Sequence, residues 1–370
     1  MAKKVNIVIS GGHAATTALA VVEEIRRRRP VIDEIHWIGS QTAFEGKKAK
    51  SLESVILPKA GVIFHPITTG RLQKKFTRWS IPSVLKIPIG FIQSFFLLLA
   101  IRPKVTLSFG GYASFPVVFC SWLLGIPVII HEQTTVAGRA NLVNARFAQR
   151  ILLARRSSLM YFPKNKCTVI GNPLLHNYFV HAKPPVNEDA PVIFITGGSR
   201  GSEIINDLVD QSLEKLLSHF KIIHQVGIIQ LDKFEIRRGK LNSEQQAKYQ
   251  IIDSVDPYAM IGIYNSVNIV VARAGANTVA EIMALKKPAL LIPIPWSYLN
   301  EQYENARFAE GFGIAEILNQ PNATVDRFMY LITKLYANRD SRIKMAAQKN
   351  SPDEYAADKL VDILLATVVK

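Results

Sequence analysis

The strongest constraint on the fold is a repeated alternation of strand-like and helix-like segments. Short runs of Val, Ile and Leu are each followed by a longer segment with helical spacing of apolar residues. Residues 5–9 and 14–29 form the first such pair, and the last helix-like segment covers residues 353–369. This alternation predicts parallel sheets covered by helices on both faces. Such sheets bind ligands beyond the carboxyl ends of their strands.

A polar stretch with three prolines divides the alternation into two halves. It begins at residue 181, has little apolar pattern and reads as a linker. The chain has 370 residues, which is long for a single core, so two domains are expected. Two similar α/β halves predict a ligand cleft between them.

The composition narrows the class of partner without choosing one. The net charge is +16, which favours nucleic acid, an acidic membrane face or a phosphorylated substrate. The two cysteines provide no disulfide framework and no metal-ligand spacing. The amino terminus runs straight into a strand, so we expect no signal peptide. The apolar run 87–101 contains Pro88 and is too short for a membrane span, which predicts a buried or membrane-surface helix.

Glycine-rich turns follow strands at four places, two in each half. They cover residues 10–13, 109–112, 197–202 and 272–281. A turn of small residues exposes backbone N–H groups at a positive helix end, which suits a phosphate. Four such turns predict substrates that carry several phosphates. In the last turn Glu281 lies one helical turn in and can accept a ribose diol; the alternative is a plain turn with a solvated glutamate.

Two nucleotide-binding alternatives fail in detail. No turn has the GxGxxG pattern with a downstream acidic residue, and no Walker lysine follows any of them. No Asp-x-Asp pair follows a strand, so a metal-bridged diphosphate is not supported, and we expect no metal and no cofactor. Leaving-group charge would fall to helix N-termini and to hydroxyls such as Ser199.

Polar residues at two other strand ends are candidates for catalysis. His13 follows the first strand and opens a helix, whose N-terminus lowers the pKa of an imidazole and suits it to be a general base. The alternative is a histidine that only caps the helix. The triplet His-Glu-Gln at residues 131–133 also follows a strand, which favours a site over a core position.

Taken together, these motifs resemble the MurG family of peptidoglycan glycosyltransferases. The similarity covers nearly the whole chain and is strongest at residues 108–138, 171–173, 197–206 and 273–306. That family moves N-acetylglucosamine (GlcNAc) from UDP-GlcNAc to lipid I, an undecaprenyl-diphosphate-linked acceptor, and forms lipid II. It has the α/β GT-B fold: two Rossmann-like, doubly wound parallel-sheet domains with a cleft between them, the terminal helix packing on the first.

The resemblance also implies a division of labour between the domains. Residues 1–180 with 352–370 would bind the acceptor and the membrane, and residues 190–351 would bind UDP-GlcNAc, with 181–190 as the linker. Glu281 would accept from the ribose, main chain near Val255 would read uracil, and Ser199 with nearby amides would hold the diphosphate. The implied donor-binding residues are Gly198, Ser199, Arg200, Val255, Ala276, Asn277, Glu281, Glu301, Gln302 and Asn305.

On the acceptor side the resemblance implies an inverting, in-line displacement. His13 would remove the proton from the acceptor's 4-hydroxyl, and Glu132 would lie near the reacting centre as a second catalytic residue. The implied acceptor-binding residues are Gly11, Gly12, Gly110, Gly111, Tyr112, Gln133 and Thr134.

Four departures from the family pattern indicate a divergent member. The family's first loop reads GGTGGH, but only Ser10-Gly11-Gly12-His13 is present here. Thr134 and Leu175 stand where Asn and Arg are usual, and Asn300-Glu301-Gln302 replaces acidic-x-His-Gln. These changes keep open a different acceptor, such as another polyprenyl-diphosphate sugar or a glycolipid.

The segment 70–81 mixes cations with bulky apolar residues. Such a segment can insert apolar side chains into a headgroup region while its cations meet anionic lipid, although a solvated loop is the alternative. The predicted contacts with the anionic inner-membrane surface are Lys74, Lys75, Phe76, Arg78 and Trp79. The family resemblance implies a peripheral protein on the cytoplasmic face of the cell membrane, with other cell-wall synthesis proteins as further partners.

The sequence disfavours two other classes of function. A nucleic-acid-binding protein needs a basic stripe with interleaved aromatic residues, but the cations are scattered outside residues 71–78, so no nucleic-acid partner is expected. A catalytically inactive nucleotide-sugar binder is disfavoured because His13, Glu281 and Gln302 are all present.

Overall fold

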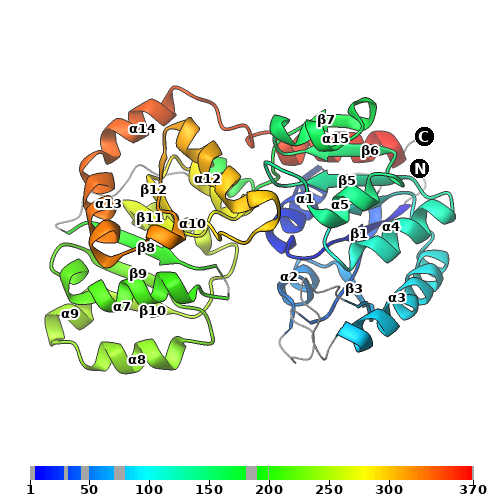
Figure 1. Cartoon of the computed structure of the whole chain (residues 1–370). Helices are drawn as coiled ribbons and strands as arrows, with labels where there is room; N and C mark the ends of the chain where they lie inside the picture. The colour runs from blue at the N-terminus through cyan, green and yellow to red at the C-terminus, as the bar shows by residue number, and fades with distance from the viewer. Residues whose placement is uncertain are drawn as a thin grey trace. The chain divides into compact units, whose positions relative to one another are not determined.

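The computed structural model describes residues 5–28, 32–42, 50–70, 80–180, 190–198 and 200–368. The chain divides into two compact units, Met1–His176 with Pro352–Lys370, and Asn177–Ser351. Each unit is an α/β structure built on one parallel sheet (Figure 1).

Unit 1 contains a seven-stranded sheet in the order β3-β2-β1-β4-β5-β6-β7. Its strands are β1 (Val5–Ser10), β2 (Ile32–Gly39), β3 (Ile63–Pro66), β4 (Thr106–Ser108), β5 (Val128–Glu132), β6 (Arg150–Leu153) and β7 (Cys167–Val169). Its helices are α1 (Ala15–Arg28), α2 (Leu52–Lys59), α3 (Ser80–Ile101), α4 (Ser114–Leu123), α5 (Arg139–Asn144) and α15 (Ala356–Val368), with 3-10 turns η1 (Arg156–Tyr161) and η2 (Lys164–Lys166). α1 contacts α2 and α15, whereas α4 contacts α3 and α5, as in a doubly wound sheet.

Unit 2 contains a six-stranded sheet in the order β10-β9-β8-β11-β12-β13. Its strands are β8 (Val192–Thr196), β9 (Lys221–Gln225), β10 (Tyr249–Ile252), β11 (Ile269–Ala272), β12 (Ala289–Leu291) and β13 (Ala315–Ile317). Its helices are α6 (Asn177–Val180), α7 (Glu203–Leu217), α8 (Leu231–Gly239), α9 (Ser243–Lys248), α10 (Met260–Ser266), α11 (Ala276–Ala284), α12 (Glu301–Phe312), α13 (Val325–Ala337) and α14 (Arg339–Ala347), with 3-10 turns η3 (Tyr298–Asn300) and η4 (Gln320–Asn322).

Both sheets have the Rossmann arrangement. The strand order reverses between β1 and β4 in unit 1 and between β8 and β11 in unit 2, and all strand pairs are parallel. All five residues of β8 are buried, as expected for a strand covered on both faces. The predicted fold class of two doubly wound parallel-sheet domains is therefore confirmed, and the topological switch points identify the sheet edges where ligands bind.

The three segments named from the sequence are confirmed with shifts of a few residues at their ends, since residues 5–9 lie in β1, 14–29 contain α1 and 353–369 contain α15. β3 and β13 were not predicted, because three or four residues carry too little periodicity to stand out. β3 is an edge strand with partly exposed residues, which weakens its apolar signal further.

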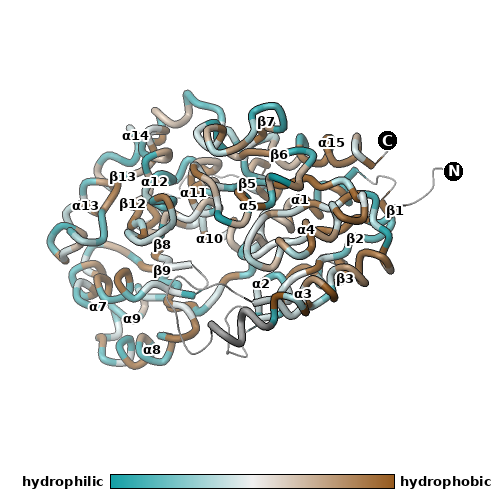
Figure 2. The backbone as a smooth tube through the Cα atoms, turned by 45° about the vertical axis from the view of Figure 1, so that its right-hand side comes forward, coloured by the Kyte–Doolittle hydropathy of each residue, from teal (hydrophilic) through white to brown (hydrophobic). Residues whose placement is uncertain are grey.

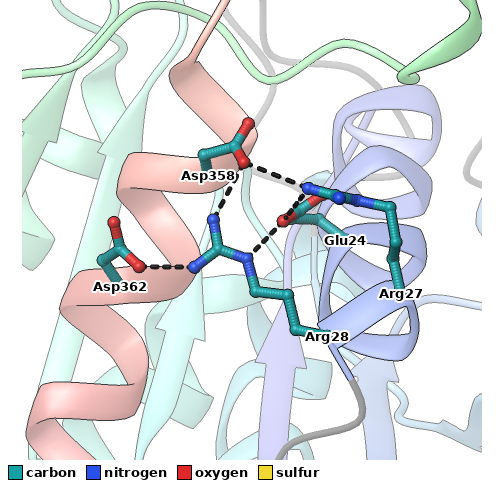
Figure 3. Close-up of polar contacts among 5 residues, drawn as sticks. All are labelled: Glu24, Arg27, Arg28, Asp358 and Asp362. Atoms are coloured by element: carbon teal, nitrogen blue, oxygen red, sulfur yellow. Dashed lines mark hydrogen bonds and ion pairs between the residues drawn. The ribbon is translucent and has the colours of Figure 1, made fainter.

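The carboxyl-terminal helix α15 packs on α1 in unit 1. Arg28 donates from Nη2 to Asp358 Oδ1 at 2.9 Å, from Nη1 to Asp362 and from Nε to Glu24. Arg27 Nη2 donates to the same Asp358 oxygen at 3.2 Å (Figure 3). A network of ion pairs thus connects the carboxyl-terminal end of α1 with α15.

A buried ion pair fastens the segment that leads into α15. Arg155 and Asp353 pair through both carboxylate oxygens, and Asp353 Oδ1 also accepts from the backbone N–H of Asn172 at 2.7 Å. Gly171 has φ +98°, and a Cβ atom there would lie 2.3 Å from the carbonyl oxygen of Pro352. The Gly-Asn-Pro motif at residues 171–173 therefore packs against the segment around residues 352–353, where the chain re-enters unit 1.

α3 and α4 are both strongly apolar helices of unit 1 (Figure 2). α3 is apolar along most of its length, and its exposed side chains include Ile89, Ile92, Phe96 and Leu99. Among the described residues, no helix combines the length and the hydropathy that crossing a bilayer requires.

Candidate active site

The two glycine turns of unit 1 meet at the carboxyl ends of β1 and β4. Phe109 N–H donates to the Ser10 carbonyl oxygen at 2.8 Å. Gly111 has φ +84°, and a Cβ atom there would lie 2.7 Å from the backbone nitrogen of Gly12. Only glycine allows this approach, so the predicted acceptor-binding pairs Gly11–Gly12 and Gly110–Gly111 form one backbone surface, with half-buried Tyr112 directly after them.

His13 lies at the same edge, but its local geometry differs from the prediction. It is exposed and has φ +62°, and α1 begins only at Ala15. The buried Glu53 of α2 accepts from the backbone N–H of Ala14 at 3.0 Å, so a carboxylate already binds a backbone donor just before α1. No sequence motif connected Glu53 with this turn, because the contact spans 39 residues.

Glu132 is buried and holds the loop that follows β5. Its Oε1 accepts from Thr134 N–H at 3.2 Å and from Thr134 Oγ1 at 2.9 Å; its Oε2 accepts from Gly138 N–H at 2.9 Å and from Asn141 Nδ2 at 3.0 Å. Burial raises the pKa of this carboxyl, while these donors lower it. This geometry is that of a loop anchor, and the catalytic role expected for Glu132 stays a prediction.

The neighbours of Glu132 are also engaged within the unit. Thr134, expected to bind the acceptor, is 9% exposed, and its hydroxyl lies 3.0 Å from the Val136 carbonyl oxygen. His131 is fully buried against the Gly171 carbonyl oxygen, and burial lowers its pKa to about 4. Gln133 is half-buried and accepts from Thr17 Oγ1 of α1 at 3.4 Å. Of residues 131–133, His131 and Glu132 are thus buried, and Gln133 is half-buried.

At the carboxyl end of β8, side chains organise the first turn of unit 2. Gly198 N–H donates to Thr196 Oγ1 at 2.8 Å, and Thr196 Oγ1 donates to Gln225 Oε1 at 2.6 Å. The Gly198 amide, which was expected to hold the donor diphosphate, thus has an internal partner. Arg200 is exposed in this turn, and Ser199 lies outside the described residues.

The second turn of unit 2 leads from β11 into α11. Gly275 is the N-cap of α11, so Ala276 and Asn277 lie in the first turn, where N–H groups have no intrahelical acceptor and the dipole is positive. Both residues are half-buried. Arg273 braces this turn by donating from Nη1 to the Ile292 carbonyl oxygen at 3.0 Å and to Gln320 Oε1 at 2.9 Å.

Glu281 lies further along α11 and is 8% exposed. Its Oε2 accepts from the hydroxyl of Tyr264 on α10 at 3.0 Å, and Tyr178 of α6 also donates to this carboxylate. Burial raises the pKa of Glu281 to about 7, and the two phenol hydrogen bonds oppose that shift. Neither tyrosine could be linked to Glu281 from the sequence, since they belong to different helices.

The residues expected to contact the donor sugar begin α12. Gln302 Oε1 accepts from Ile294 N–H at 3.1 Å, and Asn305 Nδ2 donates to the Ala274 carbonyl oxygen at 3.2 Å. Their side chains therefore tie the loop after β12 and the turn after β11 to α12. Glu301 is half-buried, and the two residues before it, Leu299 and Asn300, have φ +52° and +53°.

Val255, expected near the uracil, is half-buried in the turn after β10. Two aspartates shape that turn. Asp253 Oδ1 accepts from Ser254 N–H at 2.6 Å, and Asp256 Oδ1 accepts from Tyr258 N–H at 2.9 Å. The turn is at the same sheet edge as the turns after β8 and β9, because all these strands are parallel.

The predicted membrane contacts Lys74, Lys75, Phe76, Arg78 and Trp79 lie outside the described residues. The helix that follows them, α3, carries an open apolar groove of about 450 Å³. Its lining residues are Pro66, Ile92, Gln93, Phe96, Leu97 and Ala100.

Comparison with known proteins identifies the family. The N-terminal domain of glycosyltransferase family 28 matches residues 10–153, and the C-terminal domain of the same family matches residues 192–360. A Treponema denticola protein named UDP-N-acetylglucosamine--N-acetylmuramyl-(pentapeptide) pyrophosphoryl-undecaprenol N-acetylglucosamine transferase is 32% identical over 363 residues, covering 92% of this chain and 91% of the relative. The chain belongs to glycosyltransferase family 28.

Further relatives agree with this placement. A Bacillus cytotoxicus protein of the same name is 30% identical, with 96% of each chain covered. The crystal structure of Acinetobacter baumannii MurG has a TM-score of 0.68 at 24% identity and covers 97% of this chain and 99% of that one. UDP-GlcNAc 2-epimerase from Neisseria meningitidis has a TM-score of 0.66 at 13% identity, covering 98% and 99%, and supports the fold alone. The resemblance to the MurG family and the GT-B fold are thereby confirmed.

Proposed function

We propose that this family 28 glycosyltransferase moves GlcNAc from UDP-GlcNAc to the 4-hydroxyl of N-acetylmuramic acid in lipid I, forming lipid II for peptidoglycan synthesis. The observation that carries the proposal is the similarity to transferases named for this reaction, which extends over nearly the full length of both chains. The glycine turns at the edges of both sheets support it, because each is placed where a doubly wound sheet binds ligands.

The donor binds to unit 2 in this proposal. The positive end of α11, at Ala276 and Asn277, faces the diphosphate, with Ser199 and Arg200 from the turn after β8. Glu281 accepts from the ribose hydroxyls, and main chain near Val255 contacts uracil. Glu301 contacts GlcNAc. Gln302 and Asn305 shape the sugar site, since their side chains already hold the surrounding loops.

The acceptor binds to unit 1, over the paired glycine turns. His13 takes the proton of the 4-hydroxyl while that oxygen attacks the anomeric carbon of GlcNAc, and UDP departs with the electron pair of the broken C–O bond. One displacement inverts the anomeric configuration. The N-terminus of α11 stabilises the charge that develops on the diphosphate. Glu132 keeps the 132–141 loop in place, because its four hydrogen bonds occupy the acceptor positions of the carboxylate.

Membrane association is proposed for unit 1. The exposed apolar side chains of α3 and the basic segment 71–78 before it suit the headgroup region of an anionic membrane. In this proposal the protein lies peripherally on the cytoplasmic face, where a polyprenyl-linked acceptor is within reach. Other cell-wall synthesis proteins would be its neighbours there.

A transfer assay tests the reaction directly. Radiolabelled UDP-GlcNAc and a short-chain lipid I analogue are incubated with the protein in the presence of EDTA, and label in the lipid fraction is counted. Transfer establishes the reaction, and transfer undiminished by EDTA establishes that no divalent cation is required. Binding of UDP-GlcNAc without transfer would point to a different acceptor.

One observation favours keeping that second acceptor class. Beside the shortened first turn, the Glu53 carboxylate accepts from Ala14 N–H at the start of α1, and a carboxylate there opposes a substrate diphosphate. Another polyprenyl-diphosphate sugar, or a glycolipid whose phosphates lie elsewhere, would avoid this repulsion. Assaying such acceptors in parallel with lipid I separates the two alternatives.

A further inference from the structure

Two buried tyrosines from separate helices hold the carboxylate of Glu281. Tyr264 of α10 is 1% exposed, and its hydroxyl donates to Glu281 Oε2 at 3.0 Å. Tyr178 of α6 is 2% exposed and donates to the same carboxylate. The two rings contact each other with centroids 6.3 Å apart, and Tyr264 also packs edge to face on Phe194 of β8. These contacts fix both phenols, so the carboxylate has a defined orientation.

The Glu281 carboxylate keeps acceptor positions that the two phenols do not occupy. An ionised carboxylate offers about four acceptor positions. The two phenols occupy two of them, which leaves two for a further pair of donors. A ribose presents two adjacent hydroxyl donors, so a glutamate oriented in this way matches a cis-diol in number and in spacing.

We propose that Tyr178 and Tyr264 are positioning residues that orient Glu281 to receive the 2′- and 3′-hydroxyls of the donor nucleotide. This inference rests on the proposed binding of UDP-GlcNAc to unit 2. The tyrosines touch neither donor nor acceptor and act only through the glutamate. They set both its direction and its readiness to accept hydrogen bonds.

The electrostatics predict how this device depends on pH. Burial raises the pKa of Glu281 to about 7, and the phenols lower it. Among the described residues, Tyr264 from α10 and Tyr178 from α6 are the titratable groups that act on Glu281, and α12, which also packs on α11, adds none. Only the ionised carboxylate can accept from both ribose hydroxyls. Affinity for the ribose is therefore full above the pKa and is lost as the pH falls through it, and removing a phenol moves this loss to higher pH.

Binding measurements with two nucleotides test the inference. Dissociation constants for UDP and for 2′,3′-dideoxy-UDP are measured by calorimetry between pH 6 and 9 on the full-length protein and on Tyr178→Phe and Tyr264→Phe. We expect each substitution to weaken UDP binding at pH 7 about three- to tenfold, the range of one hydrogen bond, and to leave dideoxy-UDP binding unchanged. The midpoint of the pH dependence for UDP should rise in both variants.

A matched control separates positioning from general destabilisation. Tyr249 is 1% exposed in the same unit, and its hydroxyl lies 2.9 Å from Nδ1 of His224, away from Glu281. Tyr249→Phe should leave the ratio of the two dissociation constants unchanged. In a Glu281→Gln background, Tyr264→Phe should have no further effect on that ratio.

The failures of the two proposals are distinguishable. If the wild-type protein does not bind UDP, or binds UDP and dideoxy-UDP equally well, the proposed donor site is wrong. If the wild-type protein discriminates between them and both Phe variants keep the same ratio and the same pH midpoint, the positioning role is wrong. Equal weakening of both nucleotides would also overturn it, because the tyrosines would then be purely structural.

Discussion

At the scale of single residues, His13 combines exposure with a constrained backbone. A non-glycine residue at φ +62° is uncommon and is kept only where the surroundings enforce it. The close packing of the turns around Gly12 and Gly111 provides that enforcement. His13 is thus held at the sheet edge by its backbone, with its imidazole accessible to a substrate.

Replacing His13 with Ala should lower kcat by about two to four orders of magnitude, the usual contribution of a general base. The dissociation constant for UDP should stay unchanged, because His13 belongs to unit 1. Steady-state kinetics and calorimetry on the same preparation measure both quantities. Near-normal turnover in this variant would assign proton removal to another group.

Glu132 tests the distinction between an anchor and a catalyst. Glu132→Gln keeps the size of the side chain, but its amide nitrogen cannot accept the bonds that Gly138 and Asn141 donate to Oε2. We expect the free energy of unfolding to fall by about 2 kcal/mol, since buried donors lose their partner. Urea denaturation measures this loss.

Activity distinguishes the two roles of Glu132. At a temperature where the Glu132→Gln variant is fully folded, kcat should stay within about tenfold of the wild type, far from the loss expected of a catalytic acid or base. A loss of kcat as large as that of His13→Ala, with unchanged stability, would restore Glu132 as a catalytic residue.

At the scale of elements, α3 departs from the usual helix of an α/β unit. Such helices bury their apolar face and expose polar residues, but Phe96 is 64% exposed and Ile92 58%. Exposed apolar residues gathered on one helix face mark a contact with a membrane or a protein. The groove beside them, together with the cationic segment before the helix, favours a lipid surface.

Changing Ile92 and Phe96 together to Ser should reduce binding to vesicles of anionic phospholipid several-fold and leave UDP binding intact. Tyr330 on α13 in unit 2 is also 64% exposed and provides the matched control, since Tyr330→Ser should have no effect on vesicle binding. Phe76→Ser with Trp79→Ser should act like the α3 pair. Co-sedimentation at fixed salt measures all of these, and unchanged vesicle binding in the α3 and Phe76/Trp79 variants would refute the membrane assignment.

At the scale of the whole molecule, the chain returns to unit 1 after completing unit 2. Two sets of ion pairs hold the returning segment on unit 1, and they contribute differently to the free energy of unfolding. The Arg155–Asp353 pair is buried, with side chains 4% and 0% exposed, whereas Asp362 in the α1–α15 network is 66% exposed. Removing one partner of a buried pair strands a charge and costs about 3–5 kcal/mol, but an exposed pair contributes about 0.2–1 kcal/mol.

Asp353→Ala should therefore lower the free energy of unfolding of unit 1 by about 3 kcal/mol or more. Asp362→Ala should lower it by less than about 1 kcal/mol. Urea denaturation measures the free energy of unfolding of each variant, and limited proteolysis near residue 352 reports how readily α15 detaches. Equal effects would mean that the exposed network, rather than the buried pair, secures α15.

The sequence by itself determined the architecture and the family of this protein. Alternating periodicities specify doubly wound sheets because each strand and helix must bury its own apolar face, and this information is local. The glycine turns were located for the same reason, since small residues between a strand and a helix form a signal within a few positions. Sequence identity to named transferases over nearly the whole chain then indicated the class of reaction.

Tertiary structure alone decided what the polar side chains do. Glu132, Thr134, Gln302 and Asn305 make hydrogen bonds to nearby backbone that hold loops in place, and the sequence did not predict these bonds. Glu53, Tyr178 and Tyr264 carried no motif and yet contact the start of α1 and the Glu281 carboxylate. The physical reason is that a hydrogen bond depends on distances of about 3 Å between groups far apart in the chain, and only the packed fold sets those distances.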